Sequence, residues 1–231
     1  MKVLIASVYF AEIQQCLPIF VESINALNPK PEKTVLFDLF GELWSEAMPL
    51  LKGLEVRRIE KKENILQQFS EIRNSVLKEA KKENYEAVLF LQPNIFPPTD
   101  ILSRLSNSGK EVIAPAFFKS LGGIPYSNAL KNVGKSKPER VPFEELLPSG
   151  LKKAEAASLE AIFLRKGAFN KIEFKSPESP LQEMIGFAQQ VKNLNEEIFV
   201  DSSTVCSKLS PMQLMSHYYF KAQDNAEKKA D

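Results

Sequence analysis

The chain has 231 residues, of which 44% are hydrophobic and 26% are charged, and this balance excludes a disordered or fibrous protein. Thirty Lys and Arg against 29 Asp and Glu leave a net charge of +1, so no overall field favours nucleic acid or an acidic membrane. The length suits one sizeable core, and we expect one domain over residues 1–210, followed by a C-terminal segment and polar tail over residues 211–231.

The termini and the cysteines favour a cytoplasmic protein. Residues 1–10 contain a short apolar run, but no small-residue cleavage site follows it, so we expect no signal peptide. No stretch approaches the ~20 apolar residues that a membrane span needs. Cys16 and Cys206 lie far apart without the spacing of a zinc site or a disulfide framework. A reducing setting, without nucleic acid or a transmembrane segment, is therefore expected.

The first third of the chain alternates apolar runs with helical patterns. Residues 2–8, KVLIASV, predict a buried parallel strand. Residues 17–27 carry apolar side chains at helical spacing, and an Asn-Pro pair at residues 28–29 ends that helix. Residues 33–38 and, more weakly, residues 54–59 predict two further strands.

The same rhythm continues to residue 116. Residues 64–82 form an amphipathic helical pattern, and residues 87–91 are an apolar run that predicts a strand. Residues 92–98 have turn chemistry, a short helix capped by Thr99 follows, and residues 112–116 predict another strand. Strands that alternate with helices predict a three-layer α/β fold with a mostly parallel sheet, which binds ligands beyond the carboxyl ends of its strands.

The second half of the chain has a weaker pattern. Residues 117–149 contain several prolines and lysines and little periodicity, so we expect an irregular loop region there. Residues 154–165 have strand character, residues 168–172 and 181–194 predict helices, and residues 198–200 predict a last strand.

Four segments occur in an order that matches a known enzyme family. Ile72-Arg73-Asn74 on the long helix precedes YEAVLFLQPNIFPP at residues 85–98, and residues 161–172 and 187–209 follow. Together they resemble the inverting GT-A nucleotide-sugar glycosyltransferases of the family 2 type, in which an A-R-N helix leads to a strand that ends in D-x-D. The resemblance covers most of residues 2–209 and implies a GT-A fold with a nucleotide-sugar as partner.

The metal-binding residues of that family are replaced in this chain. Gln92-Pro93-Asn94 stands in the place of D-x-D, and neutral amides are poor ligands for Mg²⁺ or Mn²⁺. The late metal-binding histidine aligns with Lys208. No tightly bound metal or other cofactor is expected. One hypothesis is that Lys208 supplies the positive charge beside the diphosphate, and the alternative is that it is a solvated surface lysine.

The resemblance also assigns a catalytic base. The family has an E-D pair at the start of its late helix, and here Glu183-Met184 occupies that place, so Glu183 is the candidate base. An ordinary charged residue in a first helical turn is the other interpretation. Ser158 and Glu160 stand where the family often has small glycines, and they would crowd that wall of the pocket.

Three further residues are candidates for binding the donor. Asp38, at the end of the second predicted strand, corresponds to an acid that meets the base or ribose, although strand-terminal acids are common in loops. Arg73 and Asn74 fall where the helix of the family approaches the nucleotide, and a structural salt bridge is an alternative for Arg73.

Two functions follow from the resemblance. The first is transfer or binding of a sugar from a nucleotide-sugar donor, with Glu183 and Lys208 in the catalytic roles and with Asp38, Arg73, Asn74, Gln92 and Asn94 at the donor. The acceptor is unknown. The alternative is a catalytically inactive GT-A-fold protein that binds or scaffolds.

Overall fold

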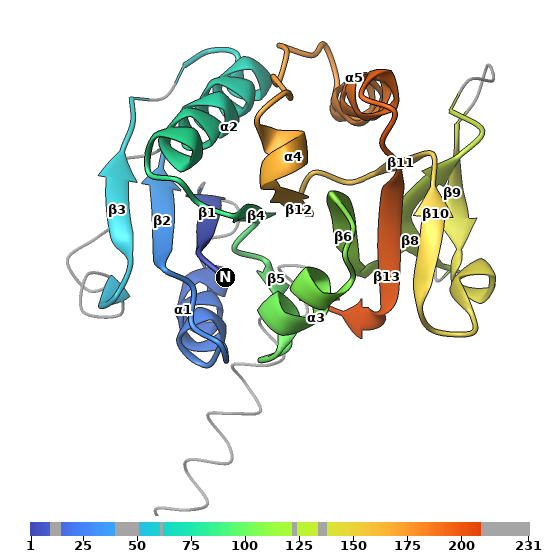
Figure 1. The fold of residues 1–231 in the computed structure, drawn as a ribbon, viewed down its shortest axis with the longest axis horizontal. Coiled ribbons are helices and arrows are strands. Elements are labelled where there is room, and N and C mark those ends of the chain that lie inside the picture. Colours follow the sequence, from blue (N-terminus) through green and yellow to red (C-terminus); the bar gives the residue numbers. More distant parts are fainter. Residues whose placement is uncertain (10–14, 40–50, 61, 122–123, 134–137, 209–231) are drawn as a thin grey trace, which may run out of the picture.

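The computed structural model describes residues 1–9, 15–39, 51–60, 62–121, 124–133 and 138–208 (Figure 1). The helices are α1 (Leu17–Asn25), α2 (Ile65–Lys82), α3 (Ile101–Asn107), η3 (Phe143–Leu146), α4 (Lys166–Phe169) and α5 (Pro180–Asn193). The strands are β1 (Val3–Tyr9), β2 (Lys33–Asp38), β3 (Glu55–Arg58), β4 (Ala87–Leu91), β5 (Ile95–Phe96), β6 (Val112–Ala116), β7 (Phe118–Leu121), β8 (Ile124–Lys131), β9 (Glu139–Pro142), β10 (Leu151–Ala154), β11 (Ala156–Ala157), β12 (Ala161–Arg165), β13 (Ile198–Val205) and β14 (Ser207–Lys208).

Eight strands form the central sheet in the order β10-β13-β6-β12-β4-β1-β2-β3. Neighbouring strands are parallel from β4 to β3 and between β6 and β13, whereas β12 runs antiparallel to both β4 and β6. At the other edge, β10 is antiparallel to β13. The predicted α/β fold with a mostly parallel sheet is therefore confirmed.

Alternate side chains of the central strands enter two separate cores. Leu4 and Ala6 of β1 pack in the core that α2, α4 and α5 cover, whereas Val3 and Ile5 pack in the core that α1 and α3 cover. This alternation follows from the two-residue period of a strand, which points successive side chains to opposite faces. Figure 1 shows the same two helical layers on either side of the sheet, so the predicted three-layer arrangement is present.

Side-chain caps fix the starts of the two longest helices. Asn64 Oδ1 accepts a hydrogen bond from Gln67 N at 3.0 Å before α2, and Ser179 Oγ accepts one from Gln182 N at 3.2 Å before α5. The predicted Thr99 cap of the short helix is wrong. That helix begins at Ile101, with Asp100 in the cap position and no side-chain cap bond.

The prediction of an irregular loop over residues 117–149 is also wrong. Strands β7, β8 and β9 form an antiparallel sheet together with β11. Asn128 joins this sheet to the central one, because its side-chain amide donates to Pro115 O at 3.0 Å and accepts from Phe117 N at 3.2 Å. Prolines within β8 and β9 removed the periodic signal that normally predicts strands.

The remaining differences between the predicted and the observed elements concern where strands and helices begin and end. The single run predicted over residues 154–165 contains the end of β10, then β11 and β12, which belong to two different sheets. The helix predicted at residues 168–172 begins and ends earlier, at Lys166–Phe169. The predicted boundary at residue 210 and the segment 211–231 lie outside the described residues. None of the described helices is long and apolar enough to cross a membrane.

A four-residue ion network fastens β3 to the sheet and to α2. Glu79 of α2 contacts Lys33 Nζ at 2.7 Å and Arg57 Nη2 at 2.8 Å, and both cations also contact Glu55. The hydrogen bonds from Arg57, followed by those from Lys33, lower the pKa of Glu79 from 4.5 to about 2. Because this pKa is lower in the folded chain, the stabilisation is present above about pH 4.5 and is lost as the pH falls toward 2.

We expect Glu79→Gln to lower the free energy of unfolding at pH 7 by about 1 to 2 kcal/mol, because a partly buried network loses its charged centre. The difference from the native chain should shrink as the pH falls from 4.5 toward 2. Urea unfolding at a series of pH values measures it, with Glu22→Gln on an exposed position of α1 as the control. A difference that does not change with pH would contradict the role of this carboxylate.

Candidate functional site

The antiparallel strand β12 brings two distant segments together at the carboxyl end of β4. Leu91, the last residue of β4, pairs with Ala161, the first residue of β12. One residue further on each side, Gln92 N donates a hydrogen bond to Glu160 O at 2.7 Å. The residues that precede β12 therefore lie at the edge of the sheet where parallel α/β sheets bind ligands.

A pocket of about 190 Å³ lies at this edge, between the first half of α2 and the start of α5. Arg73, Gln92 and Glu183, three of the residues predicted for the site, line it together with Glu160. Arg140 of β9 also lines this pocket. The sequence did not indicate Arg140, because residues 117–149 have little periodicity and no regular structure was expected there.

A buried ion pair joins the two helices at the pocket. Arg73 Nη1 of α2 donates to Glu183 Oε1 of α5, and the two side chains are only 7% and 8% exposed. The Arg73 guanidinium also faces the rings of Phe69 and Phe174, at 5.9 and 5.4 Å from their centroids. Burial lowers the pKa of Arg73, and the charge and hydrogen bond of Glu183 oppose this shift. The predicted base is thus held by a cation on the neighbouring helix.

A second ion pair involves the predicted leaving-group cation. Strand β14 pairs with β5, which places Lys208 opposite Ile95, next to the Gln92-Pro93-Asn94 turn. Lys208 Nζ donates to Glu160 Oε2, and the side chains are 14% and 23% exposed. Glu160 therefore links Lys208 to the pocket that Gln92 and Glu183 line.

The other predicted residues are more dispersed. Asp38 is fully buried at the carboxyl end of β2, where its backbone oxygen accepts a hydrogen bond from Ile59 N at 2.9 Å. Asn94 is half-buried, and its Oδ1 atom is enclosed without a hydrogen-bond partner among the described residues. Neither residue lines the 190 Å³ pocket.

Asn74 has a structural contact that the sequence did not indicate. Its side-chain amide donates to Phe174 O at 2.7 Å and accepts from Phe174 N at 2.8 Å. Both polar atoms of the side chain thus hold the segment after α4 against α2. Asn74 lines a different pocket, on the far side of this contact from Arg73, and it does not join the predicted donor site.

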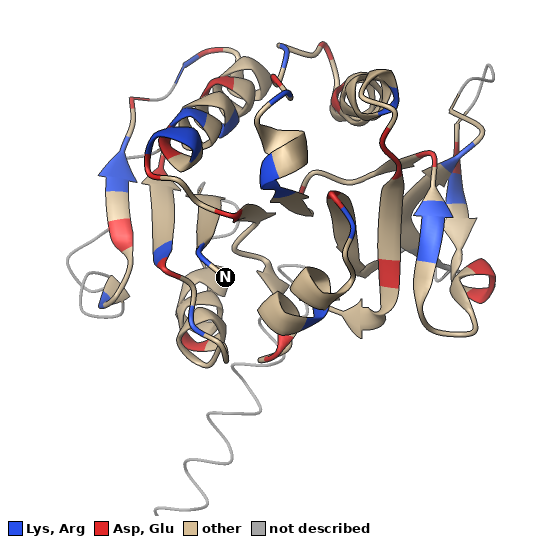
Figure 2. Cartoon of the chain, viewed as in Figure 1, with Lys and Arg blue, Asp and Glu red and all other residues tan. Residues whose placement is uncertain are grey.

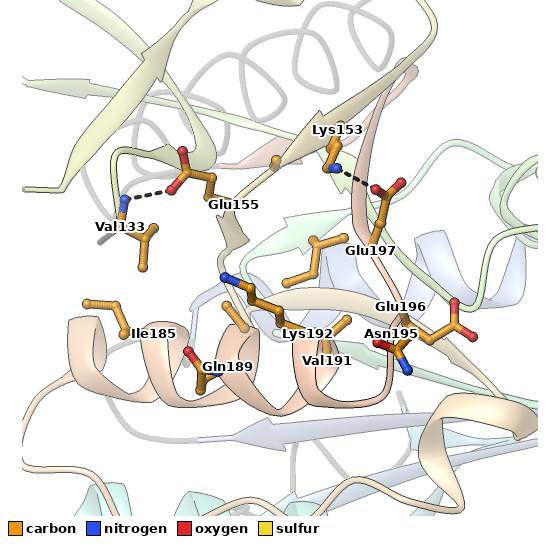
Figure 3. Close-up of a pocket in the computed structure, with 13 residues that line it drawn as sticks. Val133, Lys153, Glu155, Ile185, Gln189, Val191, Lys192, Asn195, Glu196 and Glu197 are labelled. Atoms are coloured by element: carbon orange, nitrogen blue, oxygen red, sulfur yellow. Dashed lines mark hydrogen bonds and ion pairs between the residues drawn. The ribbon is translucent and has the colours of Figure 1, made fainter. Parts of the chain in front are cut away.

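The largest described pocket, of about 610 Å³, lies elsewhere (Figure 3). It is lined by the second half of α5, the end of β10 and Ile198 at the start of β13. Figure 3 shows Lys153 paired with Glu197 on its wall, and Glu155 accepts a hydrogen bond from Val133 N at 2.8 Å. Since β13 is parallel to β6, this pocket is at the amino end of β13, which is not the ligand-binding edge of such sheets.

No model of a known protein family matches the sequence, and no curated protein matches it. Among solved structures, the chain is similar to a crystal structure of GalNAc-T7 with UDP, GalNAc and Mn²⁺, with a TM-score of 0.65 over 90% of this chain. The chain has a GT-A-type fold. It spans 44% of the length of GalNAc-T7, and at 14% sequence identity the similarity shows the GT-A fold alone.

The buried pair of Arg73 and Glu183 predicts a measurable effect on the stability of the protein. Arg73→Leu leaves the Glu183 carboxylate enclosed without its cation, which should cost about 3 kcal/mol of unfolding free energy. The double variant Arg73→Leu with Glu183→Leu should recover part of this loss, because no unpaired charge stays buried. Urea unfolding at pH 7 measures both variants.

The exposed ion pair between Lys62 and Glu71 is the matched control. Lys62→Leu should cost less than about 1 kcal/mol, since an exposed pair contributes little. An Arg73→Leu cost no larger than that of the control, or a double variant less stable than the single one, would contradict the assignment of a buried, mutually dependent pair.

Proposed function

We propose that this GT-A-type chain binds a nucleotide-sugar at the carboxyl end of β4 without a tightly bound metal. The observation that carries the proposal is the position of Lys208. Strand β14 pairs with β5 so that Lys208 is opposite Ile95, the residue after the turn at 92–94, and its ammonium group contacts Glu160, which lines the same pocket as Gln92. The structural similarity to GalNAc-T7, which was crystallised with UDP, GalNAc and Mn²⁺, supports the choice of ligand class.

The chemistry of the donor set supports a site without a metal. A diphosphate needs positive charge beside it, and Mg²⁺ or Mn²⁺ would need carboxylate oxygens to hold it there. The turn offers the amides of Gln92 and Asn94, and the nearby carboxylate of Glu160 already accepts from Lys208. Among the described residues, no three His, Cys, Asp or Glu side chains gather around a common point. Lys208 supplies an ammonium group next to the turn, and Arg140 lines the pocket as a further cation.

Binding in this way requires one exchange of partners. Lys208 is paired with Glu160 in the free chain, so a bound diphosphate must replace the carboxylate as its partner. A dianionic diphosphate is a stronger partner for ammonium than a single carboxylate, and the pair is only part-buried, with side chains 14% and 23% exposed. The pocket of about 190 Å³ is smaller than the 300 to 1,000 Å³ that ligand sites usually have, and it suits a single sugar ring.

Binding without sugar transfer is the form of the proposal that the geometry favours. Inverting transfer would use Glu183 as the base that takes the proton of the acceptor hydroxyl. Glu183 lines the pocket, but its Oε1 atom accepts from Arg73 and its side chain is 8% exposed. Transfer is the second candidate function, and it requires Arg73 to release Glu183 when donor and acceptor are bound.

We expect the native chain to be stabilised against heat by at least one member of a panel of UDP-, GDP- and CMP-sugars in the presence of EDTA. Lys208→Ala should weaken that binding about tenfold, because it removes the cation beside the diphosphate. Glu160→Gln should tighten it, because it removes the competing carboxylate. Titration followed by thermal shift and calorimetry measures these effects.

Lys192→Ala is the control, because this exposed lysine of α5 lines only the distant large pocket. Binding that requires Mn²⁺, or that is indifferent to Lys208→Ala, would overturn the proposal. Release of free nucleotide from the same donor in the presence of candidate acceptors, abolished by Glu183→Gln, would establish transfer instead of binding alone.

A further inference from the structure

A second cavity, of about 310 Å³, lies between α2 and the segment that follows α4. Asn74, Leu77, Lys78 and Lys81 of α2 form one wall, and residues 170–173 form the other. None of these residues lines the pocket at the end of β4. The cavity is therefore separate from the proposed nucleotide-sugar site.

Fixed contacts hold the two walls of this cavity together. The side chain of Asn74 makes two hydrogen bonds, of 2.7 and 2.8 Å, with the backbone of Phe174. One turn earlier on α2, Ser70 Oγ donates to Lys175 O at 3.0 Å. Leu77 and Ile172 at the base of the cavity are only 2% and 3% exposed and belong to the same core. Hydrogen bonds and buried side chains therefore fix the positions of the two walls, independently of the exposed lysines.

Three lysines from two different segments surround the opening. Lys78 and Lys81 lie three residues apart on one face of α2, and Lys171 comes from the opposite wall. Within the described part of the chain none of the three has an ion-pair partner, whereas Lys33, Lys62, Lys131, Lys153 and Lys208 all do. Figure 2 shows basic positions on α2 and next to α4.

The acids nearby do not neutralise this group. Glu79, the neighbour of Lys78 on α2, is bound by Lys33 and Arg57. Glu173 lines the cavity, and no ion pair joins it to the three lysines. The helix C-terminus explains a lysine in the last turn of α2, since cations there offset the partial charge of the last carbonyls. It does not explain why Lys171 converges on the same cavity from another segment.

We propose that this cavity binds a phosphate monoester. Three lysines that line one cavity match a group that carries about two negative charges and three acceptor oxygens, and their charge exceeds what a single carboxylate can satisfy. Asn170, which also lines the cavity, adds an amide donor. Among the described residues, no aromatic side chain lines it to provide the stacking platform of a nucleic-acid site. The volume suits a phosphate with a small organic body, either a soluble phosphate ester or a lipid headgroup.

The test is a titration of the full chain with inorganic phosphate, followed by the amide chemical shifts of residues 77–81 and 170–173. We expect saturable shifts at these residues that weaken as ionic strength rises, since exposed charges are screened. The triple variant Lys78→Gln, Lys81→Gln and Lys171→Gln should lose roughly tenfold or more in affinity. The matched control, Lys52→Gln, Lys110→Gln and Lys192→Gln, changes the net charge equally and should bind as the native chain does.

A second variant makes the result independent of loss of folding. Glu173→Gln removes a carboxylate that lines the cavity and should tighten phosphate binding by about twofold. Shifts that do not saturate, that occur elsewhere, or that weaken equally in the control triple variant would overturn the proposal, as would binding that is unchanged by Glu173→Gln.

Vesicles distinguish the two sources of the phosphate. Co-sedimentation with phosphatidylcholine vesicles that contain phosphatidic acid, lost in the cavity triple variant and retained in the control, assigns the site to a lipid phosphate. Phosphate binding without co-sedimentation assigns it to a soluble phosphate ester. The three lysines do not line the 190 Å³ pocket that Gln92 lines. These results therefore do not depend on nucleotide-sugar binding.

Discussion

The hydrogen bond from Gln92 N to Glu160 O, at 2.7 Å, joins the two segments that meet at the carboxyl end of β4. It exists because β12 runs antiparallel between two strands of the opposite direction, so that the chain entering β12 meets the chain leaving β4. Glu160 can then reach Lys208 on β14, and Ser158 joins the same pocket wall. A parallel β12 would have left Ser158 and Glu160, which precede it, at the other end of the sheet.

Two ion pairs lie at this edge of the sheet. Arg73 with Glu183 and Lys208 with Glu160 are both part-buried pairs between segments more than forty residues apart. Each pair satisfies charges that would otherwise be costly to bury, and each also occupies a side chain that catalysis would need. The same contacts hold the two side chains that sugar transfer would use, which is the reason for proposing binding without transfer.

The elements that could be predicted from the sequence share one property. The strands expected at residues 33–38, 87–91 and 112–116 have the same bounds in the structure, because each contains an apolar run that is buried on both faces. Strands β7 to β9 could not be predicted, because they pair in a small antiparallel sheet with prolines inside the strands.

For the site, the sequence could indicate position but not partners. Arg73, Gln92 and Glu183 were expected near one another and line one pocket, since the order of strands and helices determines which ends meet. The partner of Lys208 lies 48 residues away and depends on the pairing of two-residue strands, which leaves no periodic pattern. The partner of Asn74 could not be predicted either, because Phe174 lies 100 residues away in the sequence.

The two edges of the central sheet have a consequence for the behaviour of the protein at high concentration. Strand β3 at one edge carries Arg57 and Arg58, and strand β10 at the other carries Lys152 and Lys153. Charged side chains on an edge strand disfavour pairing with a second molecule, although Arg57 and Lys153 are already paired with carboxylates of the same chain. The sheet is thereby discouraged from growing between molecules, and the protein should stay dispersed rather than form fibrillar or strand-linked aggregates.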